Sequence, residues 1–319
     1  MSQAATATPT KPGIQPVSFL RYETDFEGFS RDLGDSFRRY GFAVISDHDL
    51  AQDKIDEAID DTKAFFALPE AAKLEYVVGK GGQRGYIPFG IETAKGATQS
   101  DLKEFWHIGR ELPPGHPFRA TMPDNVWPAD PAGFHTHLAW LYGALDHLGV
   151  RVLQAISHYL GLPRHQLDEA VKDGNSVLRL LHYPPVPLDA VGVRAGAHED
   201  INTITLLLGA EEAGLEVKDN DGEWLPINPP PGSVVCNIGD MLQRAVNHVL
   251  PSTSHRVVNP PPERRGVPRY STPFFLHFRP DYEIKTLPGT VSAENPDRYP
   301  DPITADDFLM QRLREIKLL

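Results

Sequence analysis

Hydrophobic residues in the first half of the chain recur at helical spacing. The first such run has apolar positions three or four residues apart, at Phe26, Phe29, Leu33, Phe37 and Tyr40. This spacing predicts an amphipathic helix with one face toward a core. We expect Thr24 or Asp25 to cap the start of the helix, and Gly41 to end it.

Three further segments have the same periodicity, and they predict helices over 53–66, 131–160 and 306–318. Pro69 begins another short helical piece. The helix over 131–160 is the longest, and its apolar residues again step by three and four. We therefore expect it to pack as the spine of the scaffold.

From Ser176 onward the pattern changes to short β-type runs separated by Pro, Gly and Asp. The predicted strands cover 177–181, 201–208, 215–217, 233–238, 254–258 and 270–278. Residues 219–222, with the sequence Asp-Asn-Asp-Gly, predict a hairpin turn. Further strands are predicted at 17–20, 42–45 and 101–107, and the glycine-rich stretch 79–96 is interpreted as a loop. This rhythm of short strands is typical of a sandwich or jelly roll.

The chain therefore divides into five regions in our interpretation. They are a disordered tail (1–15), an N-terminal α/β region (16–125), a scaffold helix (126–170), a jelly-roll core (171–285) and a C-terminal segment with a helix (286–319). The predicted fold class is mostly β with flanking helices. No internal repeat is present in the sequence.

Composition and charge narrow the possible partners. The 319 residues carry a formal net charge of −12 and no basic stripe, which argues against a nucleic-acid partner. No apolar run is long enough to predict a membrane span. Cys236 is the single cysteine and lies in an apolar run, so we expect a buried thiol and no intrachain disulfide. The single thiol and the lack of a secretory signal predict a cytoplasmic protein.

The most informative motif is His198-Glu199-Asp200, followed later in the chain by His255. Side chains at i and i+2 of a strand point to the same face, so His198 and Asp200 can bind one ion together. Two imidazoles and one carboxylate form the facial triad that holds non-haem ferrous iron with open coordination positions. The sequence therefore predicts His198, Asp200 and His255 as metal ligands.

A second pair with the same spacing follows in Arg269-Tyr270-Ser271. Arg269 offers a planar fork of donors and Ser271 a hydroxyl from the same strand face. This pair could bind the far carboxylate of a dicarboxylate cosubstrate.

The ordered motifs resemble those of the isopenicillin N synthase-like family of Fe(II)/2-oxoglutarate-dependent dioxygenases. The matching stretches are His198–Leu207, Asn237–Asp240, Ser254–Val257 and Arg269–Ser271, with Arg39–Phe42, Phe65–Pro69, Arg84–Tyr86 and Asp101–Glu104 in the first half. The resemblance covers roughly Pro16 to Arg279. It implies a double-stranded β-helix, a jelly roll whose mouth holds the iron.

The resemblance also implies the cofactors and the reaction. Fe(II) would be bound by the triad, with 2-oxoglutarate as cosubstrate and O2 as oxidant. Arg269 and Ser271 would bind the 5-carboxylate, and Tyr183 matches the family tyrosine that reaches the cosubstrate. Many plant members have Asn-Tyr-Tyr where this chain has Leu181-His182-Tyr183, so the helper hydrogen bond from Asn is missing. The implied activity oxidises, by hydroxylation, a small organic substrate and gives succinate and CO2.

Two alternatives remain open at this point. One is an iron oxidase that uses no 2-oxoacid, because the family's name-giver keeps an Arg-x-Ser pair without using one. The other is a noncatalytic metal-binding jelly roll. No motif indicates an oligomeric state.

The resemblance to the family also suggests candidate substrate contacts, in loops and strands that lie near the metal in that family. They are Arg179, Tyr86, Phe105, Trp106 and Phe275. If Arg179 points inward, a carboxylated substrate becomes plausible. His135 and His137 also have metal-pair spacing, but they lie in a predicted helix, where i and i+2 do not share a face. We interpret them as ordinary surface or core histidines.

Overall fold

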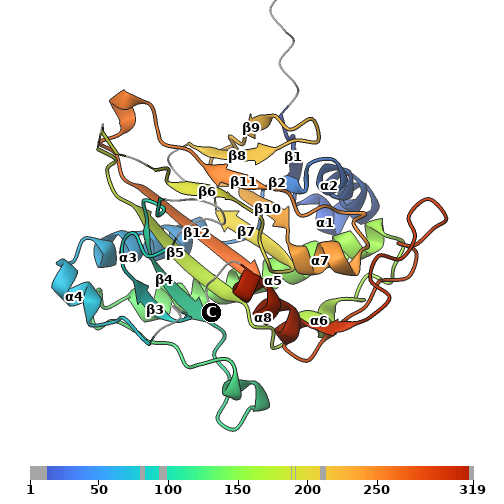
Figure 1. Cartoon of the computed structure of the whole chain (residues 1–319), viewed down its shortest axis with the longest axis horizontal. Helices are drawn as coiled ribbons and strands as arrows, with labels where there is room; N and C mark the ends of the chain where they lie inside the picture. The colour runs from blue at the N-terminus through green and yellow to red at the C-terminus, as the bar shows by residue number, and fades with distance from the viewer. Residues whose placement is uncertain are drawn as a thin grey trace, which may run out of the picture.

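Two facing β-sheets with helices packed outside them form the molecule (Figure 1). The computed structural model describes residues 13–79, 83–92, 99–187, 189–190, 192–208 and 213–315. Most of the predicted disordered tail, residues 1–12, lies outside these ranges. The arrangement is the double-stranded β-helix that the sequence predicts.

The main sheet has eight strands in the order β1-β2-β10-β7-β12-β5-β4-β3. All neighbours are antiparallel except β1 and β2. The N-terminal region supplies both ends of this sheet, so it shares one layer with the later strands. The bounds are β1 Pro16–Ser18, β2 Phe42–Ser46, β3 Gly85–Ile87, β4 Glu104–Gly109, β5 Val177–Tyr183, β7 Ile204–Leu208, β10 Val234–Ile238 and β12 Arg269–Leu276.

The smaller sheet has four strands in the order β6-β11-β8-β9. The bounds are β6 Ala195–His198, β8 Leu215–Lys218, β9 Trp224–Pro226 and β11 His255–Val257. The predicted hairpin turn joins β8 to β9, and Gly222 adopts a positive φ of 87° there. A separate two-stranded sheet pairs β13 (Glu283–Ile284) with β14 (Ile303–Thr304).

The helices lie mostly outside the main sheet, and α5 runs behind it in contact with β7 and β12 (Figure 1). No helix in the described ranges is long and apolar enough to span a membrane. The bounds are α1 Arg21–Thr24, α2 Phe26–Tyr40, α3 Gln52–Phe66, α4 Glu70–Leu74, α5 Phe134–Tyr159, α6 Asp168–Val171, α7 Asp240–Ala245 and α8 Ala305–Glu315, with 3-10 turns at Pro117–Ala120 and Pro262–Arg264.

The ends of α2 follow the sequence signals. Of the two capping candidates, Asp25 is the one that caps the helix, because its carboxylate accepts a hydrogen bond from the Gly28 N–H at 3.1 Å. Gly41 ends the helix in the left-handed region, with a φ of 69°. A side chain there would meet the Thr253 hydroxyl, so glycine is needed for space as well as conformation.

The predicted set of strands needs correction at several places. The stretch 79–96, interpreted as loop, contains β3, which forms because Tyr86 pairs with Trp106 of β4. The strands β6, β13 and β14 have no counterpart among the predicted strands, and the strand expected over 201–208 begins only at Ile204. Each difference reflects pairing between distant segments, which local periodicity does not contain.

The main sheet separates two hydrophobic clusters. The outer cluster packs its strands against the helices, and it includes Leu138, Leu206 and Phe274 together with Cys236, which is buried as predicted. The inner cluster fills part of the space between the two sheets. Its members are Phe42, Val44, Ile87, Phe105, Leu181, Tyr183, Ala195, Leu215, Val217, Ile227, Val235 and Val257. The polar side chains of the site lie in this inner layer.

Candidate active site

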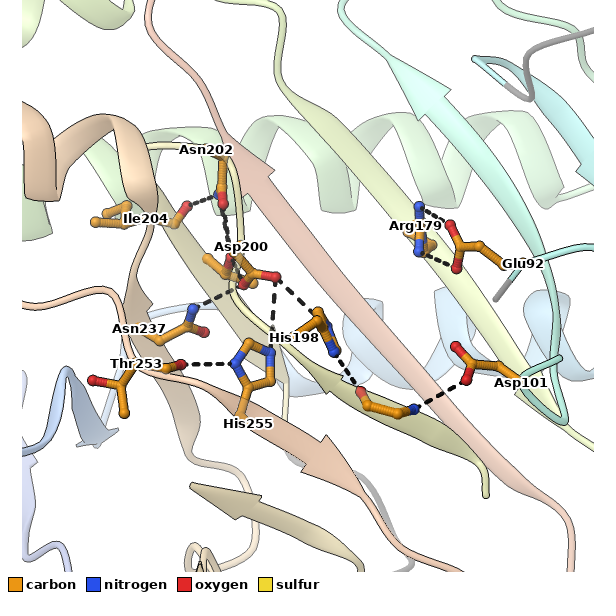
Figure 2. Close-up of polar contacts among 12 residues, drawn as sticks. Glu92, Asp101, Arg179, His198, Asp200, Asn202, Ile204, Asn237, Thr253 and His255 are labelled. Carbon is orange, nitrogen blue, oxygen red and sulfur yellow. Dashed lines mark hydrogen bonds and ion pairs between the residues drawn. The ribbon is translucent and has the colours of Figure 1, made fainter. Parts of the chain in front are cut away.

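Cross-strand pairing brings the two predicted histidine ligands together. His198 ends β6 and His255 begins β11, and the two residues are direct partners in the antiparallel ladder. Their ring centroids are 4.4 Å apart. Asp200 follows two residues after His198, and its carboxylate points toward both rings (Figure 2).

The two histidine rings converge on one oxygen of the Asp200 carboxylate. Asp200 Oδ1 lies 3.8 Å from His198 Nε2 and 3.8 Å from His255 Nε2. The three ligand atoms all lie within 4.8 Å of one another, close enough to share one ion. Two imidazole nitrogens and one carboxylate are the donor set of a non-haem Fe(II) centre, so these residues fit that metal.

Backbone carbonyls orient both rings. His198 Nδ1 lies 2.8 Å from the Gly196 carbonyl, and His255 Nδ1 lies 3.2 Å from the Thr253 carbonyl. A proton on each Nδ1 would donate to that carbonyl and leave the Nε2 lone pair for the metal. Desolvation of the ring, although its side chain is 40% exposed, and the neighbouring His255 together lower the pKa of His198, which keeps this ring neutral at pH 7, as a ligand must be.

The other carboxylate oxygen of Asp200 is held by two donors. Thr205 Oγ1 donates to Asp200 Oδ2 at 2.5 Å, and Asn237 Nδ2 donates to it at 2.8 Å. Thr205 and Asn237 are themselves direct partners across β7 and β10. Burial alone would raise the pKa of Asp200, but the two histidines and these two donors lower it, so the carboxylate stays ionised.

The three predicted cosubstrate residues line the same cavity between the sheets. Arg269 and Ser271 lie on one face of β12, and Arg269 pairs across the ladder with Tyr183 of β5. The Arg269 guanidinium carbon lies 5.2 Å from the centre of the Tyr183 ring, and Arg269 is only 3% exposed. The structure thus brings a buried guanidinium, a hydroxyl and a phenol to one wall.

Among the five candidate substrate contacts, Arg179 and Phe275 line the cavity. The full lining is Phe42, Lys103, Arg179, Leu181, Tyr183, Ala195, His198, Asp200, Thr205, Leu207, Leu215, Asn237, His255, Val257, Arg269, Ser271, Pro273 and Phe275. Phe105 belongs to the inner cluster, and its ring centre lies 4.3 Å from the Arg179 guanidinium carbon.

Tyr86 and Trp106 lie on the face of the main sheet that is turned away from the cavity, so the expectation that they contact the substrate is wrong. Successive residues of a strand point to opposite faces, so Phe105 and Trp106 of β4 cannot both face the cavity. Trp106 packs in the outer cluster, with its ring centre 4.8 Å from that of Phe65. Tyr86 is its cross-strand partner, and its hydroxyl donates to the buried Glu104 carboxylate.

His135 and His137 stand apart from the metal centre, on α5. His137 Nδ1 lies 2.7 Å from Asp61 Oδ2. Within the described ranges, neither His135 nor His137 belongs to a group of side chains that could hold a metal ion. The sequence motifs contain Lys103, Thr205 and Asn237 but indicate no role for them. The only sequence feature that could have pointed to these three residues is their position within, or next to, predicted strands.

A jelly roll with two histidines and one aspartate converging at its mouth defines the class of mononuclear non-haem Fe(II) oxygenases. The family models agree with this class. Residues 16–130 match the model described as non-haem dioxygenase in morphine synthesis, N-terminal, and residues 174–278 match the 2OG-Fe(II) oxygenase superfamily. The chain belongs to this superfamily, and it is an Fe(II)- and 2-oxoglutarate-dependent dioxygenase.

Relatives of known sequence or structure cover nearly the whole chain. The 2-oxoglutarate-Fe(II) type oxidoreductase hxnY of Emericella nidulans is 33% identical, over 94% of this chain and 89% of its own. A 2OG-Fe(II) oxygenase family protein from Caulobacter crescentus is 68% identical, with a TM-score of 0.91 over 96% of this chain and all (100%) of its own. A Neurospora crassa protein, crystallised in complex with alpha-KG and thymine, is 30% identical, with a TM-score of 0.84 over 97% of this chain and 98% of its own.

Proposed function

We propose that this enzyme hydroxylates a C–H bond of a small organic molecule held in the inter-sheet cavity, with 2-oxoglutarate bound by Arg269, Ser271 and Tyr183. The main support for this proposal is that the metal ligands and the predicted cosubstrate residues line the same cavity. The triad, carried by β6, the residues that follow it and β11, lines the same cavity as the Arg269–Ser271 pair of β12.

The chemistry of the Arg269 wall fits a dicarboxylate. A guanidinium offers two parallel donors to a carboxylate, and the Ser271 hydroxyl adds a third from the same strand face. The burial of Arg269 strengthens its attraction for an anion, because charges interact more strongly away from bulk water. A 2-oxoglutarate bound here by its 5-carboxylate would leave its 2-oxoacid end for the Fe(II) that His198, Asp200 and His255 would hold, since all these residues line one cavity.

The His182 position supports this division of roles. Its Nδ1 lies 2.7 Å from the Glu104 carboxylate, and its ring stacks on Tyr270 with centroids 4.7 Å apart. His182 thus points away from the cavity, into the outer layer, and it does not replace the missing asparagine. In our proposal the cosubstrate contacts come from Tyr183 and the β12 pair.

The protein's own part in the reaction is to position and to exclude water. When bound, Fe(II) and 2-oxoglutarate supply the oxidising chemistry, in which one atom of O2 goes to succinate and the other to the substrate hydroxyl, with loss of CO2. Thr205 and Asn237 fix the Asp200 carboxylate, and the carbonyls of Gly196 and Thr253 fix the imidazoles. Apolar walls from Leu181, Leu207, Val257 and Phe275 keep bulk water from the reacting centre.

A small organic substrate fits the remaining wall, which contains Arg179 and Phe275. The Neurospora crassa protein, which is similar over nearly the whole chain, forms a complex with thymine and alpha-KG. This precedent supports a small-molecule substrate for the present enzyme without fixing its identity.

The test is stoichiometry. With a substrate found by screening, we expect one succinate per product molecule and a product heavier than the substrate by one oxygen atom. Oxidised product without succinate would instead indicate the iron oxidase. The absence of iron-dependent 2-oxoglutarate consumption, with and without candidate substrates, would indicate a noncatalytic metal-binding protein.

A further inference from the structure

Four charged side chains form a compact group, held together by ion pairs, at the wall of the cavity that the metal ligands also line. Lys103 and Arg179 line the cavity, and Glu92 and Asp101 lie behind them. The Arg179–Glu92 pair is drawn in Figure 2 together with the metal ligands. We refer to these four residues as the charged wall.

Arg179 keeps some of its donors for a ligand. Its Nη1 and Nη2 each lie 3.2 Å from a different Glu92 oxygen, and its Nε donates to His107 Nε2 at 2.7 Å. A guanidinium has five N–H bonds, and these contacts use three of them. The side chain is held in place by the flanking rings of Phe105 and Phe275, whose centres lie 4.3 Å and 5.4 Å from the guanidinium carbon.

Lys103 is anchored in the same way. Its Nζ lies 2.7 Å from Glu92 Oε2 and 2.9 Å from Asp101 Oδ2. An ammonium group has three N–H bonds, so one remains beyond these two contacts. Asp101 also accepts the Gly196 N–H at 3.0 Å, which ties the charged wall to the strand that carries His198.

The charges of this group cancel. Burial alone would raise the pKa of Glu92, but Arg179 and Lys103 lower it well below its usual range. Burial alone would lower the pKa of Lys103, but Glu92 and Asp101 keep it raised. Two cations therefore face two anions, and the group as a whole is neutral at physiological pH.

The part of the cavity formed by the metal ligands and Arg269 also has no net charge once Fe(II) and 2-oxoglutarate are bound. The two positive charges of Fe(II) and the one of Arg269 match the one negative charge of Asp200 and the two of 2-oxoglutarate. A substrate that carried a net charge into this space would therefore have no counter-ion among the described lining residues. Burying an uncompensated charge is strongly unfavourable.

We propose that the substrate presents an uncharged group with an acceptor oxygen, such as an amide, imide, lactam or ketone carbonyl, to the remaining N–H donors of Arg179 and Lys103. This inference rests on the proposed function and narrows its substrate class. It also revises the prediction of a carboxylated substrate, because Arg179 points inward but already has a carboxylate partner in Glu92.

Three nearly isosteric probes separate the possibilities: benzamide, benzoate and benzamidine. We would measure their binding to the full chain, loaded anaerobically with Fe(II) and 2-oxoglutarate, by calorimetry and by thermal shift. The wild type should bind benzamide at least about tenfold more tightly than either charged probe, a ratio that corresponds to about 1.4 kcal/mol.

Two substitutions should change the preferred charge in opposite directions. Glu92→Gln leaves the charged wall with one excess positive charge and should favour benzoate. Arg179→Gln leaves one excess negative charge and should favour benzamidine. Glu111→Gln removes a charge from a side chain that is 59% exposed, away from the described lining, and should keep the wild-type order.

The pattern across these variants decides the inference. It is overturned if the wild type prefers benzoate, or if Glu92→Gln does not gain benzoate binding relative to the wild type. If no probe binds the wild type, benzoate binding by Glu92→Gln alone still supports the balance of charge, and its absence counts against it. The proposed function is checked separately, by Fe(II)-dependent succinate release from 2-oxoglutarate in the wild type.

Discussion

The hydroxyl of Thr205 offers a sharp test of how this site holds its metal. Thr205→Val keeps the shape of the side chain and removes the donor to Asp200 Oδ2, which lies 2.5 Å away. Asn237 then remains as the other donor to that oxygen, at 2.8 Å. The Asp200 carboxylate would be less firmly oriented, and its pKa would rise, so protons would compete better with the metal.

The magnitude follows from the strength of such a bond. A hydrogen bond to a charged group contributes about 1.5–3 kcal/mol, and every 1.4 kcal/mol is tenfold in affinity. Because the bond is present with and without metal, only part of it affects binding. Substitutions of residues that support metal ligands typically cost roughly 10- to 100-fold in affinity, and we expect the lower end, about tenfold.

The assay is anaerobic calorimetric titration of Fe(II) into the metal-free protein, with circular dichroism to confirm folding. Thr203→Val is the matched control, because Thr203 is equally buried and its hydroxyl has no hydrogen-bond partner in the described ranges. It should bind Fe(II) like the wild type. Wild-type affinity in Thr205→Val, or an equal loss in both variants, would refute the role we give to this hydroxyl.

Three further substitutions test other parts of the structure. Asp200→Ala should abolish Fe(II) binding and turnover with the far-ultraviolet circular dichroism unchanged, and full turnover would disprove the metal assignment. Arg269→Ala should raise the KM for 2-oxoglutarate by about thirtyfold or more, with a smaller effect on kcat, since losing a buried charge partner costs about 2–5 kcal/mol and every 1.4 kcal/mol is tenfold. Glu104→Gln should lower the free energy of unfolding by about 3 kcal/mol in urea titrations, because Glu104 is buried and lies 2.7 Å from the buried ammonium of Lys73. The exposed Glu169→Gln, by contrast, should change it by about 0.5 kcal/mol or less.

Much of the fold is predictable because its signals are local. The spacing of apolar residues locates α2, α3 and α5 to within a few residues, since one face of each helix must pack into the hydrophobic core. The Asp25 cap and the Gly41 stop depend on side chains next to the helix ends. The pairing of His198 with Asp200 is predictable from their i, i+2 spacing, although Asp200 lies two residues beyond the end of β6 and not within a strand.

Other features depend on which strands become neighbours. The register of β6 with β11 places His198 opposite His255, and that of β7 with β10 places Thr205 beside Asn237. The sequence contains these residues but not the distances between them. The expected substrate contact of Trp106 is wrong, because a strand's period does not say which of its faces is turned to the cavity.

The charged wall is the feature of the site that the sequence predicts least. Glu92, Asp101 and Lys103 come from the segment before β4, and Arg179 from β5. The sequence shows an arginine that could bind an acid. Only the tertiary structure shows that its charge is already balanced, because electrostatic interactions depend on separation in space, not along the chain.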